Sequence, residues 1–402
     1  MQVHDRLSTA TTTQLPAALA LYVHWPFCRK KCPYCDFNSH VRDAVDHDAW
    51  REALLAELRF MHRMCAHTQP LTSIFFGGGT PSLMQAQTVG DIIALSQKLW
   101  GHDAQIEITL EANPTSVEAS SFAEFAAAGV NRVSLGIQSL NAKSLTFLGR
   151  EHSADEALSA LEIANRHFTR TNFDLIYALP WHTPRLWEKE LREALNYERG
   201  HVSLYQLTIE ENTAFYHSYH HKKDFALPSP ELSAELYNIT QHVMEHARMP
   251  AYEISNHAGL GEASVHNLSY WRGDPYIGIG PGAHGRIRTQ SKPDFFHATH
   301  TLKSPERWLE AVVRDGHGLE SFSQITHHER AQERLLMGLR LTEGFALNSL
   351  SADERTAFDA QIHPRALSML QSEGLLTTHN DLWRATPRGR LVLNAIITQL
   401  LT

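Results

Sequence analysis

The stretch LYVHWPFCRKKCPYCDFNSH, residues 21–40, carries the most informative pattern in this chain. It sets Cys28, Cys32 and Cys35 in a C-x-x-x-C-x-x-C spacing, and the 402-residue chain has only four cysteines in all. A cubane [4Fe–4S] cluster normally takes four thiolates. Three thiolates on one short loop fit three of its corners and leave the fourth iron open. We therefore expect an iron–sulfur site with an open coordination position.

A disulfide or a zinc site would also use cysteines, but each fits this spacing less well. A disulfide leaves one of the three unpaired, and nothing in the sequence signals secretion. A zinc site needs four ligands, which His24 or His40 would have to complete. The fourth cysteine, Cys65, falls on the helical pattern HDAWREALLAELRFMHRMC and is expected to be a buried small hydrophobic residue rather than a ligand.

Three basic residues, Arg29, Lys30 and Lys31, lie between the first two cysteines. Positive charge at this place would lower the pKa of the thiols and offset the charge of a cluster. An ordinary solvated basic loop would contain the same residues, so the sequence is compatible with both roles.

The composition is that of an ordinary globular protein, with 43% hydrophobic and 20% charged residues. The formal net charge of −8 gives no general attraction to nucleic acid, so no nucleic-acid partner is expected. No apolar run is long enough to span a membrane. The segment LPAALALYV, residues 15–23, lacks a basic segment before it and predicts a buried strand instead of a signal peptide. We expect a cytoplasmic protein.

Strand patterns alternate with helical patterns after the cysteine loop, and such repeats predict a parallel sheet. The number of repeats suits a partial or full barrel with its chemistry at the carboxyl ends of the strands. The expected strands are residues 71–76, 105–114, 131–139, 171–180 and 201–210, and the expected helices are residues 87–100, 117–129, 158–168 and 185–197.

Polar residues and glycines follow these strands. The run Gly77-Gly78-Gly79-Thr80 would let backbone N–H groups approach a ligand, or would simply form a tight turn. Glu111 ends the next strand, where a carboxylate binds ribose hydroxyls in dinucleotide folds or caps a loop. Farther along come Gln138, Arg150 and Asp174, each of them a weak signal alone.

The cysteine spacing with an aromatic residue before the third cysteine resembles the signature of the radical S-adenosylmethionine (SAM) superfamily. Within it, YVHWPFC, FFGGGTPSLM, LEANP, RVSLGIQSL, LGREH and FDLIYALP resemble the oxygen-independent coproporphyrinogen oxidases (HemN) and the related haem chaperones (HemW). The resemblance implies a [4Fe–4S] cluster on the three cysteines, with SAM on the open iron. It also implies SAM contacts from Tyr22, Tyr34, Gly78, Gly79, Thr80, Glu111, Gln138, Arg150 and Asp174.

Three features favour the chaperone branch of this family. Phe37 stands where the oxidases carry a further cysteine, and only about twenty residues precede the first expected strand. The third feature is HNLSYW, residues 266–271, which resembles a chaperone motif implicated in haem binding. His266 is therefore the candidate haem ligand, although a lone histidine is more often hydrogen-bonded inside a core. His284, in GIGPGAHG, is a second candidate.

The C-terminal pattern of helices, a hairpin and a last helix predicts a mainly helical, winged-helix-like domain. From Ile325 onward it holds eight Arg, no Lys and eight Asp plus Glu, a neutral balance that argues against binding DNA phosphates. We expect a short tail at residues 1–18, a radical SAM barrel with its extension at residues 19–320, and a HemN-like C-terminal domain at residues 321–402.

Three functions are compatible with these features. The preferred hypothesis is a haem chaperone that binds haem, passes it to acceptor proteins and takes electrons from a donor. The alternative is a coproporphyrinogen III oxidase-like enzyme that decarboxylates porphyrinogen propionates oxidatively. The third possible function is that of a regulatory protein whose fold is stabilised by a zinc ion. The histidine-rich run at residues 217–223 is expected to be a solvated loop.

Overall fold

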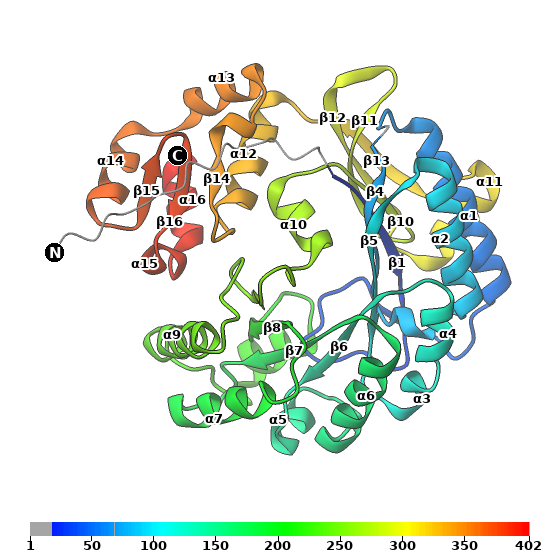
Figure 1. Cartoon of the computed structure of the whole chain (residues 1–402), viewed down its shortest axis with the longest axis horizontal. Coiled ribbons are helices and arrows are strands. Elements are labelled where there is room, and N and C mark those ends of the chain that lie inside the picture. The colour runs from blue at the N-terminus through cyan, green and yellow to red at the C-terminus, as the bar shows by residue number, and fades with distance from the viewer. Residues whose placement is uncertain (1–17, 68, 402) are drawn as a thin grey trace.

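The computed structural model describes residues 18–67 and 69–401, and its main feature is one curved mixed sheet (Figure 1). The 11 strands stand in the order β13-β12-β11-β10-β1-β4-β5-β6-β7-β8-β9. The strands from β10 to β8 run parallel, whereas β11, β12, β13 and β9 join antiparallel. The outer strands β13 and β9 are not paired with each other in this order. The sheet is therefore open, and the expected α/β fold with a partial (βα) barrel is confirmed.

The strands are bounded as follows. The parallel ones are β1 (Leu19–Trp25), β4 (Leu71–Gly78), β5 (His102–Ala112), β6 (Arg132–Gln138), β7 (Arg170–Tyr177), β8 (His201–Gln206) and β10 (Tyr276–Ile279). The antiparallel ones are β9 (Asn256–Ala258), β11 (His284–Thr289), β12 (Lys292–Thr301) and β13 (Leu319–Gln324). Most side chains of β1 are buried, as expected for a strand that is covered on both faces. The tail expected at residues 1–18 lies, apart from Ala18, outside the described residues.

Helices cover the outer face of this sheet (Figure 1). They are α1 (His47–Met64), α2 (Ala86–Trp100), α5 (Ala142–Phe147), α6 (Ala154–His167) and α7 (Pro184–Ala194), followed in the chain by α9 (Pro230–His246) and α11 (Pro305–Asp315). Local sequence explains several starts, since Ser153 and Glu156 form a capping box at α6 and Thr183 caps α7 before Pro184. Cys65 is buried at the end of α1, as predicted.

Two expected elements differ from the structure. The helix expected at residues 117–129 is broken into α3 (Ser116–Ala119) and α4 (Phe122–Ala127). Ser120 bonds the carbonyl oxygen of Val117 through its hydroxyl at 2.7 Å, a local bond that competes with helix continuation. The histidine-rich run is helical instead of a loop, with α8 (Ala214–His217) leading into a π-helical turn at Ser218–Lys222.

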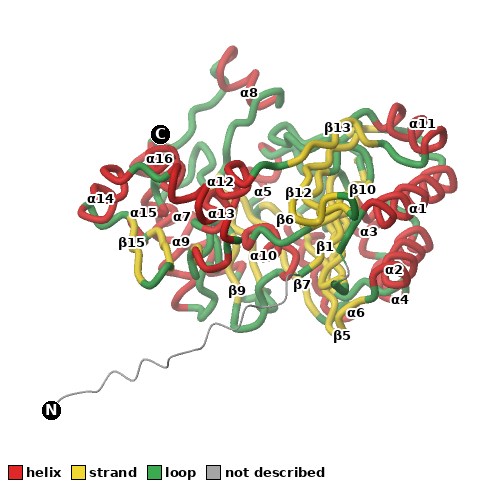
Figure 2. Tube along the Cα trace, turned by 90° about the horizontal axis from the view of Figure 1, so that it is seen from above, coloured by secondary structure: helices red, strands yellow, loops and turns green. Residues whose placement is uncertain are grey.

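The C-terminal region has its own hydrophobic core, which begins at Ala331 and ends at Leu400. It contains α12 (His327–Gly338), α13 (Ala352–Gln361), α14 (Pro364–Ser372), α15 (Pro387–Arg390) and α16 (Leu393–Leu401), with β14 (Phe345–Ala346), β15 (Leu376–His379) and β16 (Leu382–Ala385). The expected hairpin is β15–β16, and β14 adds a third strand. Figures 1 and 2 place α14–α16 at the opposite end of the molecule from α1 and α2.

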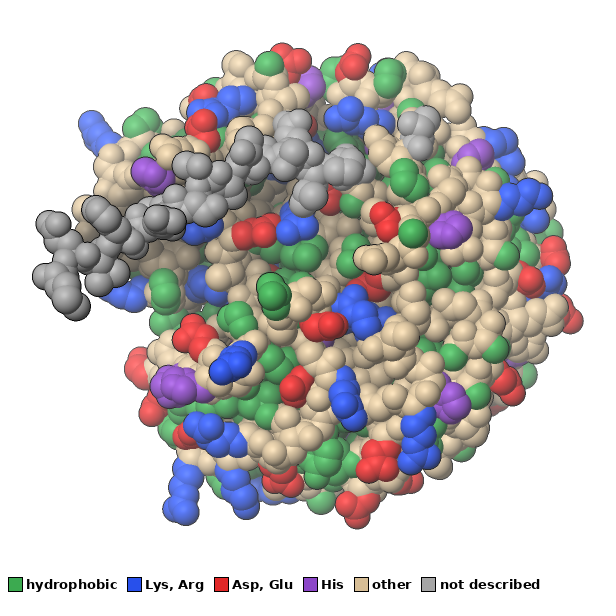
Figure 3. Space-filling model, viewed as in Figure 1, with side chains coloured by type: hydrophobic (Ala, Val, Ile, Leu, Met, Phe, Trp, Pro, Cys, Tyr) green, Lys and Arg blue, Asp and Glu red, His purple; other side chains and the backbone are tan. Residues whose placement is uncertain are grey.

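Helix α10 (Val265–Arg272) connects the two regions, because it contacts β1 and β4 on one side and α12 on the other. Basic and acidic side chains are interspersed over the face drawn in Figure 3. Among the described residues, none of the helices combines the length and the apolar character needed to cross a membrane.

Candidate functional site

The cysteine loop is held at the carboxyl ends of the parallel strands. Two short parallel strands, β2 (Phe27–Cys28) and β3 (His40–Val41), pair with each other at the two ends of the loop and hold it in place. All three cysteines of the loop are free and half-buried. They line one cavity of about 450 Å³, which we call the cysteine cavity.

Each cysteine sulfur has a polar neighbour. Thr80 Oγ1 donates to Cys28 Sγ at 3.4 Å, and Arg150 Nη1 donates to Cys32 Sγ at 3.4 Å. Ser39 Oγ lies 3.8 Å from Cys35 Sγ. Donors aimed at sulfur favour thiolates, so these surroundings suit thiolate ligands.

Burial nevertheless dominates the acidity of two of these thiols, because it raises the pKa of Cys28 and of Cys35. The basic residues of the loop are partly engaged elsewhere: Lys30 lies 3.6 Å from Glu151, and Lys31 donates to the carbonyl oxygen of Ser39 at 3.5 Å. The lowered pKa expected from these charges is therefore not found for Cys28 and Cys35.

The donor set fits a cluster better than a single ion. No three His, Cys, Asp or Glu side chains among the described residues are gathered around one point where they could hold a metal ion. In a cubane each cysteine binds a different iron, so the three sulfur atoms need not converge. Cys28, Cys32 and Cys35 on one cavity wall meet that requirement.

The glycine run lies directly against the cysteine loop. A Cβ atom on Gly79 would lie 2.7 Å from the carbonyl oxygen of Phe27 and 3.0 Å from Cys28 Sγ, so only glycine permits this approach. The N–H groups of the run are used inside the protein: Gly78 donates to Glu111 at 3.2 Å, and Gly79 donates to Trp25 at 2.7 Å. The run is therefore suited to offer a ligand carbonyl oxygens, rather than the N–H groups expected from the sequence.

Glu111 and Asp174 contribute two desolvated carboxyl groups to the cysteine cavity. Burial, and then repulsion from Asp174, raises the pKa of Glu111 to about 8. Burial raises the pKa of Asp174 to about 6, although Ser203, Arg132 and other partners oppose it. Both residues line the cysteine cavity, where a ligand with hydroxyl donors would find acceptors.

Gln138 and Arg150 also line this cavity. Gln138 ends β6 in the left-handed region with a φ of 69°, a conformation that non-glycine residues rarely adopt and that is concentrated at functional sites. Arg150 Nη2 donates to Asn113 Oδ1 at 2.6 Å and to the carbonyl oxygen of Gly136 at 2.8 Å. Arg150 thus joins the strand ends to the cysteine loop.

Of the two tyrosines expected to contact SAM, only Tyr34 lines the cysteine cavity. Tyr22 lines a second cavity of about 940 Å³ that lies beside it. The two cavities share wall residues, among them Phe37, Gly78 and Glu111, and are therefore neighbours. The hydroxyl of Tyr22 is engaged with His24 Nδ1 at 3.0 Å.

His266 is a core residue in this structure, with 1% of its surface exposed. Its Nδ1 lies 3.0 Å from Ser73 Oγ, and its Nε2 lies 3.0 Å from Tyr270 Oη. Both ring nitrogens are thus engaged. Burial lowers the pKa of His266 to about 3, so the ring is neutral. Its neighbours Asn267, Tyr270 and Trp271 line the second cavity, and so does His284.

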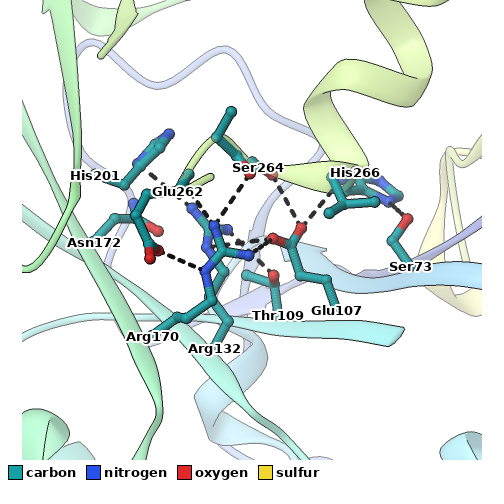
Figure 4. A network of polar contacts seen from close by, with 12 residues as sticks. Ser73, Glu107, Thr109, Arg132, Arg170, Asn172, His201, Glu262, Ser264 and His266 are labelled. Atoms are coloured by element: carbon teal, nitrogen blue, oxygen red, sulfur yellow. Dashed lines mark hydrogen bonds and ion pairs between the residues drawn. The ribbon is translucent and has the colours of Figure 1, made fainter. Parts of the chain in front are cut away.

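A buried ionic network holds the start of α10 (Figure 4). Glu107 lies 2.7 Å from Arg170 and 3.8 Å from Arg132, and it accepts the backbone N–H of His266 at 3.1 Å. Burial opposes ionisation of Glu107, but the two arginines outweigh it and lower its pKa. Figure 4 shows His266 pointing from this network toward Ser73.

Several residues of these cavities were not predicted from the sequence. Asn113, Ser134 and Tyr205 line the cysteine cavity; the first two lie on or next to strands whose other residues were singled out, whereas Tyr205 lies on β8, which held no candidate residue. Asn113 follows Glu111 in LEANP, so its position at a strand end was a usable signal. Arg340 and Met337 of the C-terminal region line the second cavity, and no sequence signal pointed to them.

Comparisons with known proteins agree with this geometry. The model of the radical SAM superfamily matches residues 22–194, and the model of the HemN C-terminal domain matches residues 325–392. A bovine relative, mitochondrial "Radical S-adenosyl methionine domain-containing protein 1", is 38% identical over 95% of this chain and 87% of its own length. The chain belongs to the radical SAM superfamily.

Other relatives place it in one part of that superfamily. A protein of Escherichia coli named "Heme chaperone HemW" is 35% identical over 94% of this chain and 97% of its own length. The structure of coproporphyrinogen III oxidase HemN from Escherichia coli superimposes with a TM-score of 0.79, covering 96% of this chain and 90% of that one at 21% identity. This match shows a shared fold. As in the radical SAM superfamily generally, the cofactors are a [4Fe–4S] cluster and SAM.

Proposed function

We propose that this protein is a haem chaperone, which binds haem and transfers it to acceptor proteins. The observation that carries the proposal is the cavity of about 940 Å³ faced by the HNLSYW helix and adjoining the cysteine cavity. The names of the bacterial relatives, at 30% to 35% identity over most of the chain, support it.

In this proposal Cys28, Cys32 and Cys35 hold the cluster, and Arg150 and Thr80 stabilise the thiolates through their bonds to sulfur. When bound, such a cluster supplies single electrons to SAM. A protein that delivers electrons to the cluster is then a required partner.

SAM would lie against the strand ends of the cysteine cavity. Carbonyl oxygens of Gly78, Gly79 and Thr80 would accept its amino group, and Glu111 would accept its ribose hydroxyls. Gln138, Arg150 and Asp174 would bound the rest of the pocket, with Tyr34 against the adenine. Tyr22 would act indirectly, because its hydroxyl is held by His24 outside this cavity.

His266 remains a predicted haem ligand, but it can bind iron only after a change in its hydrogen bonds. It must leave its hydrogen bond to Ser73 or to Tyr270 before a ring nitrogen is free to bind iron. The division into a barrel at residues 19–320 and a C-terminal domain at residues 321–402 also stays a prediction. So does the cytoplasmic location, since the bovine relative is named as mitochondrial.

The proposal is tested by titrating haem into anaerobically reconstituted protein while following the Soret band, with coproporphyrinogen III turnover measured in parallel. Saturable binding near one haem per chain without turnover supports the chaperone. Anaerobic formation of protoporphyrinogen IX without haem binding would contradict it and favour the oxidase-like enzyme.

A further inference from the structure

The second cavity carries features of a site for a flat, metal-bearing ligand with carboxylate groups. Its lining is rich in aromatic side chains, including Tyr270, Trp271 and Tyr276. Phe37, at the boundary with the cysteine cavity, exposes 57% of its surface. Exposed aromatic rings around a concave surface usually mark a binding site, and they suit the face of a macrocycle.

One arginine of this cavity has no acidic partner. Arg286 is paired with Glu333 at 2.8 Å, and Arg330 lies 3.4 Å from the same carboxylate. Arg340 has no such ion pair within the described ranges 18–67 and 69–401, and its guanidinium lies 4.8 Å from the ring centre of Trp271. Lys303 also lines the cavity without an ion pair in those ranges, so Arg340 and Lys303 are the cations of this wall that remain available to a ligand.

Two buried donors at this place lack acceptors. Trp271 Nε1 and Arg340 Nε are both inaccessible to solvent and without a hydrogen-bond partner among the described residues. A buried donor without an acceptor costs about 1–3 kcal/mol. Both residues line the cavity, so a carboxylate bound there can pair with the guanidinium of Arg340.

The cavity also presents an imidazole that is not engaged. His284 is exposed at the start of β11 and lines the cavity, and it has no hydrogen bond on its ring nitrogens within the described part of the chain. Its ring stacks on His300 with 4.2 Å between the centres, which fixes its plane. Partial burial and the neighbouring His300, Arg286 and Lys303 lower the pKa of His284, so a neutral imidazole is present near pH 7. Neutral imidazole is the form that binds haem iron.

We propose that haem occupies the second cavity with its iron on His284 and a propionate on the guanidinium of Arg340. This inference rests on the proposed function and names its site. It assigns the first contact of haem to His284 and leaves His266 in its core position, where Ser73 and Tyr270 hold it.

The test uses the full chain, reconstituted anaerobically, in wild-type form and as His284→Ala, His266→Ala and Arg340→Gln. The matched controls are His220→Ala, which changes an exposed histidine outside the cavity, and Arg365→Gln, which changes an exposed arginine of the C-terminal region. Haem and the dimethyl ester of haem, whose carboxylates are blocked, are titrated into each while the Soret band is recorded. Iron content and circular dichroism check that each variant holds its cluster and fold.

We expect His284→Ala to weaken haem binding about tenfold or more and to shift the Soret band, which added imidazole restores. Arg340→Gln should weaken haem binding about tenfold, while binding of the dimethyl ester stays as in wild type. The two controls should leave both affinities unchanged.

Two outcomes would overturn the inference in distinguishable ways. If His284→Ala keeps the wild-type haem affinity and Soret band while His266→Ala loses haem binding, then His266 is the ligand. The chaperone proposal would still hold in that case. Absence of haem binding in the wild-type protein would overturn both the site and the proposed function.

Discussion

Arg150 donates a hydrogen bond from Nη1 to the sulfur of Cys32 at 3.4 Å, across 118 residues of sequence. The same guanidinium bonds Asn113 and the backbone of Gly136, so one side chain ties the cysteine loop to two strand ends. The position of the loop relative to the sheet therefore depends on this arginine.

Replacing Arg150 tests that dependence. Arg150→Lys keeps the positive charge but loses the forked arrangement of N–H donors. Each lost hydrogen bond to a charged partner is expected to reduce stability by about 1.5–3 kcal/mol. We expect faster loss of iron in air and about tenfold weaker SAM binding by calorimetry. Arg166→Lys, on an exposed helix surface, is the control. Equal iron retention in both variants would contradict the assigned role.

The cysteines divide into ligands and a core residue. Cys32→Ser should abolish the iron–sulfur absorbance while the thermal unfolding of the cluster-free protein stays unchanged, because the loop lies outside the large sheet. Cys65→Ser should show the reverse: full iron content, but a free energy of unfolding lower by about 1–3 kcal/mol, since it buries a hydroxyl. Full iron in Cys32→Ser would show that the ligand assignment is wrong.

Much of this arrangement follows from local sequence, and the rest does not. The strands up to β8, the strand ends at Gly78, Glu111 and Gln138, and the C-terminal hairpin were predicted because residue patterns of short range specify them, whereas β9 to β13 were not predicted. The hydrogen-bond partner of His266 was not predictable, because Ser73 lies 193 residues away. The unpaired state of Arg340 depends likewise on how the C-terminal helices meet α10.

Binding of SAM should depend on pH through Glu111. Burial and Asp174 raise the pKa of Glu111 to about 8, so in the free protein the carboxyl group is largely protonated at pH 7. Ribose hydroxyls donate to the ionised form, so affinity should rise as the pH increases from about 6 to 9, with proton release on binding. Calorimetry in buffers of different ionisation enthalpy measures both quantities. Glu111→Gln should bind weakly with a flat pH profile, and an unchanged profile in this variant would refute the assignment.

The ionic network under α10 should contribute strongly to stability. Glu107→Gln takes the ionic partner from the buried Arg132, whereas Arg170 keeps Glu262 at 3.0 Å, and leaving a buried charge uncompensated typically costs about 3–5 kcal/mol of stability. It also weakens the acceptor that holds the backbone of His266. Chemical denaturation should show this loss, whereas Glu162→Gln on the surface should change stability by less than about 0.5 kcal/mol. A small effect at Glu107 would mean that the network is dispensable.

A haem chaperone must hand haem to an acceptor protein, and this transfer can be measured. Reconstituted protein is loaded with one equivalent of haem, freed of excess and mixed anaerobically with apomyoglobin as a probe acceptor. We expect the Soret band to convert to that of myoglobin at a rate that depends on acceptor concentration, because the acceptor takes part in the transfer. Conversion at a rate independent of acceptor concentration would mean that haem merely escapes into solution and that the protein does not hand it to an acceptor.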